Sequence, residues 1–252
     1  MKTIAIANQK GGIGKTTTAL MTATGLLHCG YKVLFVDIDP QCNSTSSYKA
    51  VTEDTYTLYD LMNDKCSTKE AIQTTAVGDI IACDELLTTD ESKFLSRMGG
   101  FNILKNKLKE VQDEYDFCVI DTPPDLGIFM YNALCAADGT IIPVRAEKYA
   151  VDGLSRLIST INDVVSSANP NLKIYGVLFT CYDIRNKLDK NMWKALPKMG
   201  KNFGFNVFKT PIRICQAIKD SQANGTNLFD VNPSSNAARD YAQFLRELLK
   251  EV

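Results

Sequence analysis

Histidine is almost absent from this chain: its 252 residues include only one, His28. A single histidine excludes a metal site built from several imidazoles and argues against a Ser-His or Cys-His hydrolase. Neither sign of charge is in excess, because 28 Lys and Arg residues face 29 Asp and Glu residues, which gives a formal net charge of −1. Bulk charge therefore gives no support for nucleic-acid binding, and any such site has to be a local patch.

Long hydrophobic runs are also missing, since no apolar stretch approaches the roughly 20 residues that a membrane span needs. The sequence has no basic region leading into an apolar segment at its start, so we expect a cytoplasmic protein. Its eight cysteines form no Cys-x-x-Cys pair, and several lie within apolar runs. We expect them to be reduced and mostly buried thiols.

What remains is an ordinary globular composition, with 45% hydrophobic and 23% charged residues. This excludes disorder, collagen and coiled coil. The length suits one large α/β domain, and no repeat or linker divides it. We therefore expect a single domain over residues 1–252, with a polar surface loop at Gln41–Thr55.

Short β-branched or aromatic runs alternate with stretches of helical periodicity. The predicted strands are Thr3–Asn8, Lys32–Asp37, Gly78–Ala82, Phe117–Asp121, Gly139–Val144, Lys173–Thr180 and Asn206–Lys209. The predicted helices are Thr16–Cys29, Thr57–Leu61, Lys93–Asp113, Gly127–Ala137, Val151–Ser167, Asp189–Phe203 and Asn236–Glu251. Apolar strands that alternate with helices are typical of a parallel sheet covered on both faces. The expected fold is thus a single doubly wound, mostly parallel α/β sheet flanked by helices.

A glycine-rich segment, Lys10–Thr17, follows the first predicted strand and opens the first helix. In such a P-loop, backbone N–H groups and the helix dipole bind phosphate oxygens. Lys15 then reaches the β- and γ-phosphates, and Thr16 offers its hydroxyl to Mg²⁺. The usual first glycine is replaced by Gln9, so this is a variant form with a second lysine, Lys10. The predicted nucleotide-binding residues of the loop are Lys10, Gly11, Gly12, Ile13, Gly14, Lys15, Thr16 and Thr17.

Two further predicted strands end in carboxylates. The segment Val33–Pro40 ends with Asp37 and Asp39 at the sheet edge where doubly wound folds bind ligands. The segment Phe117–Pro124 has the form of a Walker B element, in which Asp121 positions Mg²⁺ through water. Each could alone be a helix cap or a turn. Together with the P-loop, and in this order, they predict a magnesium–nucleotide site.

Nearly end to end, the chain resembles the ParA/Soj family of partition ATPases, within the deviant Walker A (MinD/ParA) class of P-loop NTPases. The segments that carry the resemblance are Ala7–Gly12, Asp37–Gln41, Asn43–Ser46, Asp121–Pro124, Asn132–Leu134, Tyr149–Leu154, Tyr182–Arg185 and Ser234–Leu249. The first loop defines the class, and the later segments point to the ParA branch. The resemblance implies an ATPase whose cofactors are ATP and Mg²⁺.

The resemblance also implies a role for each site residue. Lys15, Thr16 and Thr17 would contact the phosphates within one subunit. Lys10 is similar to the signature lysine that reaches the partner's phosphates in a nucleotide-sandwich dimer, so that assembly would gate hydrolysis. Asp39 matches the carboxylate that orients the attacking water. The implied metal residues are Thr16, Asp37 and Asp121; the implied switches are Gln41–Ser46 and Asp121–Gly127; and the adenine pocket would include Pro211.

A locally basic segment runs from Lys173 to Lys219. Its basic residues are Lys173, Arg185, Lys187, Lys190, Lys194, Lys198, Lys201, Lys209, Arg213 and Lys219, against the acids Asp183 and Asp189. Charge alone favours a solvated helix face, because the lysines follow helical spacing. In Soj-like proteins, however, the positions that match Arg185 and Arg213 carry DNA-contacting residues. We therefore predict sequence-nonspecific DNA contacts from Arg185, Arg213 and Lys187.

The resemblance implies a Mg-ATP-dependent dimerising switch that binds DNA nonspecifically as an ATP-bound homodimer. It would segregate a plasmid or chromosome with a ParB-like centromere-binding adaptor, which stimulates an otherwise weak hydrolysis of ATP to ADP and phosphate. We expect a nucleoid-associated cytoplasmic protein without a membrane partner. We expect no N-terminal helix-turn-helix domain and hence no operator-specific repression.

Three relatives of the same superfamily remain as alternatives. A MinD-like membrane ATPase needs a basic amphipathic terminal helix, whereas the predicted helix Asn236–Glu251 has mixed charges and an apolar side suited to the protein's own core. An iron–sulfur reductase needs a cysteine soon after the Walker B aspartate; Leu126–Met130 has none, and Cys118 and Cys135 are better core thiols. A metabolic ATP-dependent ligase, such as a dethiobiotin-synthetase-like enzyme, needs a second substrate pocket that no motif identifies.

Overall fold

A computed structural model of the chain describes residues 1–147 and 150–252, so that Tyr149, in one of the segments that carry the resemblance, lies outside them. Within these residues, seven strands form one sheet in the order β3-β4-β2-β5-β1-β6-β7. Their bounds are β1 Lys2–Ile6, β2 Val33–Asp37, β3 Ile72–Thr75, β4 Gly78–Ile81, β5 Phe117–Asp121, β6 Gly139–Val144 and β7 Lys173–Phe179. All neighbouring strands are parallel except β3, which runs antiparallel to β4. The predicted doubly wound, mostly parallel sheet is confirmed.

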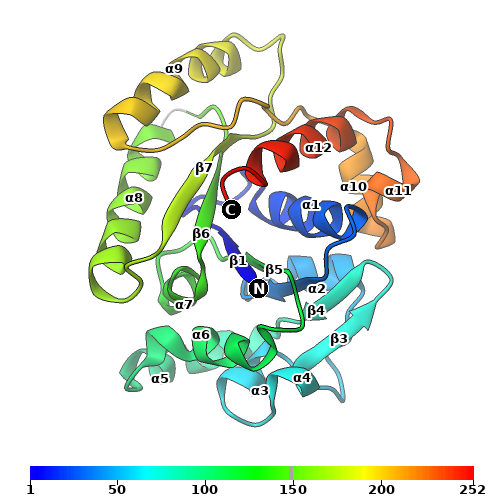
Figure 1. Cartoon of the computed structure of the whole chain (residues 1–252), viewed down its shortest axis with the longest axis vertical. Coiled ribbons are helices and arrows are strands. Elements are labelled where there is room, and N and C mark those ends of the chain that lie inside the picture. Colours follow the sequence, from blue (N-terminus) through cyan, green and yellow to red (C-terminus); the bar gives the residue numbers. More distant parts are fainter. Residues whose placement is uncertain (148–149) are drawn as a thin grey trace.

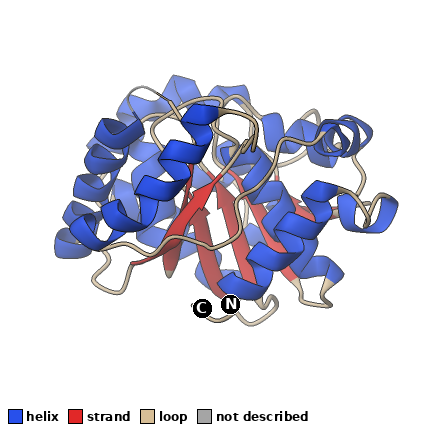
Figure 2. Cartoon of the chain, turned by 90° about the horizontal axis from the view of Figure 1, so that it is seen from above, coloured by secondary structure: helices blue, strands red, loops and turns tan. Residues whose placement is uncertain are grey.

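Helices cover both faces of this sheet (Figures 1 and 2). The α-helices are α1 Lys15–His28, α2 Asn43–Tyr48, α3 Leu58–Met62, α4 Thr68–Ala71, α5 Glu91–Ser96, α6 Ile103–Leu108, α7 Ile128–Ala136, α8 Ala150–Ser167, α9 Lys187–Phe203, α10 Gln216–Asn224, α11 Leu228–Val231 and α12 Asn236–Leu248. The short 3₁₀ segments of the described chain are η1 Glu85–Asp90, η2 Gly100–Asn102 and η3 Lys109–Val111.

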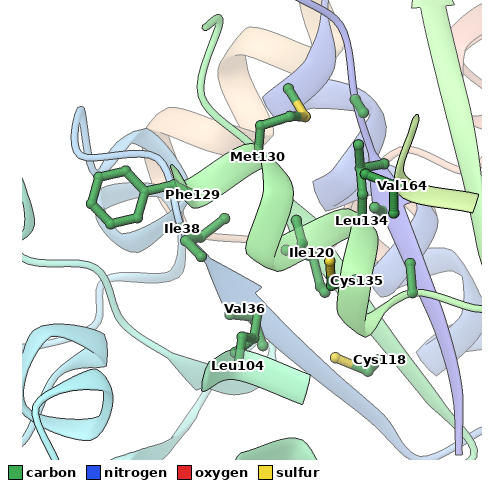
Figure 3. Packing of buried hydrophobic residues seen from close by; sticks show 14 of the residues in the cluster. Val36, Ile38, Leu104, Cys118, Ile120, Phe129, Met130, Leu134, Cys135 and Val164 are labelled. Atoms are coloured by element: carbon green, nitrogen blue, oxygen red, sulfur yellow. The ribbon is translucent and has the colours of Figure 1, made fainter. Parts of the chain in front are cut away.

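Each face of the sheet has its own apolar core, because successive side chains of a strand point to opposite faces. In β5, Phe117 and Val119 join the cluster beneath α1 and α12, whereas Cys118 and Ile120 join the cluster beneath α7. Figure 3 shows this second core from close by, with Ile120 near Cys135 of α7. Cys118 and Cys135 are fully buried, as expected for core thiols, and neither is available as a surface ligand for an iron–sulfur cluster.

The terminal helix α12 packs its apolar side onto the core. Tyr241 and Phe244 are almost completely buried, and α12 lies beside α1 (Figure 1). No helix in residues 1–147 and 150–252 is long and apolar enough to cross a membrane. The predicted docking of the last helix onto the protein itself is confirmed.

Two predicted elements are wrong. The segment Asn206–Lys209 is not a strand: it makes a single bridge, from Val207 to Val177 of β7. The continuous helix predicted for Lys93–Asp113 is broken into α5, η2, α6 and η3. The first piece ends at Ser96, where Arg97 turns to an extended conformation. Gly99 then starts η2 with a φ of +74°, a left-handed conformation that glycine adopts without strain.

Among the described residues, the elements that were not predicted are β3, α2, α4, η1, α10 and α11. The short polar edge strand β3 pairs with β4 through a tight turn, and its sequence lacks a run of apolar residues. Helix α2 lies within the segment Gln41–Thr55, which was expected to be a loop. Helix α10 follows Cys215 and has few apolar residues to mark its period.

Candidate nucleotide site

The carboxyl ends of β1, β2 and β5 meet at one edge of the sheet. Ile6, the last residue of β1, pairs in register with Asp121 of β5, and Asp37 of β2 pairs with the same Asp121. The P-loop leaves β1 at this edge and leads into α1. The fold therefore brings together the three sequence segments that were predicted to form the site.

The P-loop has the backbone of an anion-binding turn. Gly12 and Gly14 adopt φ values of +71° and +87°, which a side chain would strain. Gly14 is also the N-cap of α1, and, as a glycine, it has no side chain to accept a hydrogen bond from the first turn of the helix. The first N–H groups of α1 therefore remain available to a ligand, and the helix dipole favours a negative one.

Lys15 is buried at the centre of this loop, with 6% of its surface exposed. Its amine donates a hydrogen bond of 2.8 Å to the backbone carbonyl of Lys10. Burial lowers the pKa of Lys15, and the charges of Asp121, Asp39 and Asp125 oppose that shift. Lys15 thus lies close to carboxylates, at the position from which a P-loop lysine contacts phosphate.

Asp121 has a carboxylate oxygen in need of a partner. Its Oδ2 accepts a hydrogen bond of 2.8 Å from Ser44, but its buried Oδ1 has no hydrogen-bond partner among the described residues. Burial raises the pKa of Asp121, the hydrogen bond from Ser44 and the nearby hydroxyl of Thr16 lower it, and the charge of Asp39 raises it. A buried and unsatisfied carboxylate oxygen is costly unless something positively charged or protic meets it.

Asp37 holds the first switch in place. Both the backbone N–H and the hydroxyl of Thr45 donate to its Oδ2 at 2.8 Å, and the N–H of Asp39 donates to its Oδ1 at 3.2 Å. Burial and the charge of neighbouring Asp121 raise the pKa of Asp37. Since both oxygens are already engaged, the contacts of Asp37 fit a residue that anchors helix α2 beside the metal site.

These residues fit Mg²⁺ that arrives with a nucleotide. No group of three or more His, Cys, Asp or Glu side chains in the described chain can hold a metal ion by itself. Mg²⁺ typically binds through one or two carboxylates, with phosphates and water completing its shell. The unpartnered oxygen of Asp121 and the hydroxyl of Thr16 are the donors that such an ion would use.

A cavity of about 460 Å³ opens over the P-loop. Its lining residues are Gly11, Gly12, Gly14, Lys15, Thr16, Thr17, Asp39, Gln41, Asn43, Pro124 and Cys181. Asp39 is held at its edge, because its Oδ1 accepts from Gln41 N–H at 3.0 Å and its carbonyl accepts from Cys42 N–H at 2.8 Å. The cavity thus joins the phosphate loop, the first switch and the segment after β7.

Lys10 lies outside the lining of this cavity. Its amine is 3.5 Å from Glu147, on the loop after β6, and its stem passes over Gly153 of α8. Neighbouring Gln9 donates to the carbonyl of Gly153 at 2.9 Å, which holds the start of the loop toward α8. The amine of Lys10 therefore contacts the loop after β6 and not the lining of the cavity.

Pro211 is not among the residues that line the cavity. It lies half-buried in a segment joined to the end of β7, where Tyr182 N–H donates to Ile212 carbonyl at 2.8 Å. Cys181, which does line the cavity, was not predicted. Its backbone φ of +53° turns the chain over the P-loop, a feature that the residue type does not reveal.

The predicted DNA-contacting residues lie on two adjoining segments. The bridge between Tyr182 and Arg213 places the segment of Arg213 beside the one that leads to Arg185 and Lys187. Arg185 is 87% exposed and pairs with Asp183 at 2.9 Å; Arg213 pairs with Asp240 at 2.6 Å. The lysines of α9 at positions 187, 190, 194, 198 and 201 are exposed.

Comparison with known proteins agrees with this geometry. Residues 1–174 match a family model described as an AAA domain. The chain is 36% identical over 250 residues to the sporulation initiation inhibitor protein Soj of Bacillus subtilis strain 168, covering 98% of each chain. It is 34% identical over 250 residues to the chromosome-partitioning ATPase Soj of Treponema pallidum strain Nichols, covering 98% of this chain and 97% of that one.

Solved structures are similar over almost the whole chain. McdA from Cyanothece, solved in its apo form, has a TM-score of 0.88 at 27% identity, with 99% of each chain covered. A cobyrinic acid a,c-diamide synthase from Mycobacterium smegmatis, solved with ADP and magnesium, has a TM-score of 0.85 at 29% identity, with 99% of this chain and 94% of that chain covered. A variant of McdA has been solved as a complex with ATP. The synthase holds ADP and magnesium and the McdA variant holds ATP, in agreement with the cofactors that the sequence predicted.

The fold and the cavity define a P-loop NTPase of the α/β class. Within that class, the chain belongs to the ParA/Soj family of partition ATPases. The family predicted from the sequence is thereby confirmed.

Proposed function

We propose that this protein is a Mg-ATP-dependent switch ATPase that segregates DNA. ATP binding produces a homodimer, the dimer binds DNA nonspecifically, and a ParB-like centromere-binding adaptor stimulates a slow hydrolysis that releases it. The observation that carries the proposal is the separation of the two loop lysines: Lys15 lines the phosphate cavity, whereas the amine of Lys10 lies 3.5 Å from Glu147. A second copy that supplies Lys10 would complete the site.

Each site residue has a role in this proposal. Lys15 and Thr17 bind phosphate oxygens, and Thr16 and Asp121 hold Mg²⁺, which neutralises charge on the phosphates when bound. Asp39, at the edge of the cavity, orients the attacking water. Lys10 of the partner subunit then meets the charge that develops on the transferred phosphoryl group, as an arginine finger does. Hydrolysis in one subunit alone is weak because it lacks that charge.

The DNA-binding face consists of Arg185, Lys187 and Arg213. These residues lie on adjoining segments, and the exposed lysines of α9 extend the same basic region. Contacts from such side chains to phosphate carry no base information, so binding is independent of sequence. A dimer presents two copies of this face, which strengthens binding through multivalency.

The rest of the proposal concerns setting and partners. Residues 1–252 act as a single ATPase domain in the cytoplasm, associated with the nucleoid through nonspecific DNA binding. The relatives that support this include the chromosome-partitioning ATPase Soj of Treponema pallidum and the chromosome partitioning protein ParA of Caulobacter vibrioides, which is 34% identical over 254 residues.

DNA binding without nucleotide, with ADP and with ATP tests the proposal. Fluorescence anisotropy of a random-sequence duplex, at two salt concentrations, should show binding with ATP only. That binding should weaken steeply as salt rises, because phosphate contacts release counterions. Absence of binding with every nucleotide would refute the DNA-segregation function and leave the nucleotide site standing.

A second candidate is a metabolic ATP-dependent ligase. The observation that favours it is the fold similarity to cobyrinic acid a,c-diamide synthase, at a TM-score of 0.85. The full-length identity of 34–36% to Soj proteins favours the partition function instead. The same DNA-binding experiment separates the two functions, since a metabolic ligase is not expected to bind DNA in an ATP-dependent manner.

A further inference from the structure

Arg213 is held by one carboxylate through a side-on pair. Its Nε donates to Oδ2 of Asp240 at 2.8 Å, and its Nη2 donates to Oδ1 at 2.6 Å. The backbone N–H of Arg213 donates to the same carboxylate at 3.1 Å. Three donors from one residue thus converge on Asp240, which fixes both the side chain and the backbone of the arginine.

The other edge of the guanidinium remains open. Nη1 donates to no acceptor in the part of the chain that the structure describes, and 42% of the side chain is exposed. A guanidinium carries five N–H donors in a planar fork, so a side-on pair leaves donors on the opposite edge. That edge is suited to a phosphate oxygen, which accepts two parallel N–H groups.

Asp240 is itself held rigidly. It is 7% exposed, and its helix α12 is bound to α1 by the next residue: the hydroxyl of Tyr241 lies 3.3 Å from that of Thr18. Tyr241 and Phe244 bury the same helix in the core. Because Thr18 directly follows the P-loop, this chain of contacts fixes the guanidinium relative to the nucleotide site.

We propose that Asp240 is a positioning residue of the DNA-binding face, which orients Arg213 so that its open edge meets a backbone phosphate. The inference rests on the proposed DNA binding and goes beyond it, because it assigns a role in binding a polyanion to a buried acid. An ordered guanidinium loses less conformational freedom on binding than a free one. Asp240 therefore strengthens DNA binding although its own charge opposes it.

The direction in which one substitution changes the DNA affinity tests this inference. Asp240→Asn keeps the shape of the side chain but removes a negative charge, which by simple electrostatics tightens DNA binding. We expect the opposite: weaker binding by about tenfold with a non-hydrolysable ATP analogue, since one charge-assisted contact is lost. The slope of log Kobs against log salt concentration should become shallower by about one phosphate contact.

A matched control removes one negative charge from an aspartate that does not contact Arg213. Asp220 on α10 is exposed and its carboxylate accepts a hydrogen bond from Gln216. Asp220→Asn should leave DNA affinity unchanged or slightly tighter. In an Arg213→Gln background, Asp240→Asn should no longer weaken binding, because there is no guanidinium left to orient.

The outcomes separate this inference from the proposed function. If wild-type protein binds DNA and Asp240→Asn binds as tightly or more tightly, Asp240 masks the arginine or is neutral, and the inference is wrong. If Asp240→Asn weakens binding equally with Arg213→Gln present, its role is structural and the inference is also wrong. If the wild-type protein itself fails to bind DNA with ATP, the proposed function fails first. Nucleotide affinity, measured on each variant, should stay at the wild-type value, and each variant should melt cooperatively well above the temperature of the binding assay.

Discussion

The amine of Lys15 donates a 2.8 Å hydrogen bond to the backbone carbonyl of Lys10. The two lysines of one loop are therefore in contact, yet their amines have different surroundings: Lys15 feels the charges of Asp121 and Asp39, and Lys10 pairs with Glu147. A phosphate would offer Lys15 a charged acceptor in place of a neutral carbonyl, which is the stronger interaction. Loss of either lysine should therefore have a distinct consequence.

Lys15→Ala should abolish ATP binding. Removal of its charge-assisted contacts to phosphate should weaken the affinity by about a hundredfold or more. Titration of a fluorescent ATP analogue measures this directly, with Lys2→Ala as a control at an exposed lysine of β1. Ordinary ATP affinity in the Lys15 variant would refute the assigned phosphate site.

Lys10→Ala should retain ATP binding by the single chain but lose dimerisation and hydrolysis. Lys10 is absent from the cavity lining, so its loss leaves the cis contacts intact. A charge supplied in trans to a phosphoryl transfer is worth roughly a thousandfold in rate, so hydrolysis should fall to background. Light scattering with and without ATP measures the molecular mass and hence dimerisation. A Lys10→Ala variant that dimerises and hydrolyses ATP normally would contradict the role of Lys10 in trans.

Asp39→Ala should keep ATP-dependent dimerisation and DNA binding while losing hydrolysis. The side chain is held at the cavity edge by Gln41 N–H and is placed to act on water rather than on the nucleotide. Phosphate release measures hydrolysis, and the fluorescence anisotropy of labelled DNA measures DNA binding, both on the same preparation. Loss of nucleotide binding would instead make Asp39 a structural or metal-positioning residue.

Asp121→Asn should stabilise the ligand-free protein while it removes magnesium-dependent hydrolysis. In the wild-type protein Asp121 is a buried carboxylate that has one unpartnered oxygen and is repelled by the charge of Asp37. The substitution replaces this carboxylate with a neutral amide. Relief of that cost should add about 1–2 kcal/mol to the free energy of unfolding. For a chain of this size that is a rise of roughly 3–6 °C in melting temperature. A lower melting temperature would show that Asp121 is already well satisfied without a metal.

Much of the fold follows from local patterns. Strands such as β5 are continuous apolar runs buried on both faces, and α12 has a clear apolar side, so both are recognisable without tertiary information. The segment Lys93–Asp113 was mispredicted because its helical periodicity persists across Arg97 and Gly99, where an extended and then a left-handed backbone interrupt the helix. Asn206–Lys209 has strand-like residues but makes only one bridge to β7.

The parts of the site that could be predicted are those in which the functional residues lie close together in the sequence. The P-loop and the two aspartate-ended strands are of this kind. Contacts between distant segments were not predictable: Ser44 meets Asp121, and Asp240 meets Arg213 across 27 residues of sequence. Such pairs depend on how α2 and α12 dock onto the sheet, which no local spacing encodes.

Complementation between two inactive variants tests the central claim most directly, namely that one chain completes the ATP site of another. Asp39→Ala and Lys10→Ala proteins are each expected to be inactive alone. Mixed in equal amounts, they form a heterodimer in which the Lys10→Ala subunit keeps Asp39 and receives Lys10 of the partner subunit. The account predicts that hydrolysis, which neither variant shows alone, is recovered in the mixture, because one of the two sites of each mixed dimer is complete. If Lys10 acted within its own chain, every site would lack one residue, and a mixture as inactive as its parts would contradict the account.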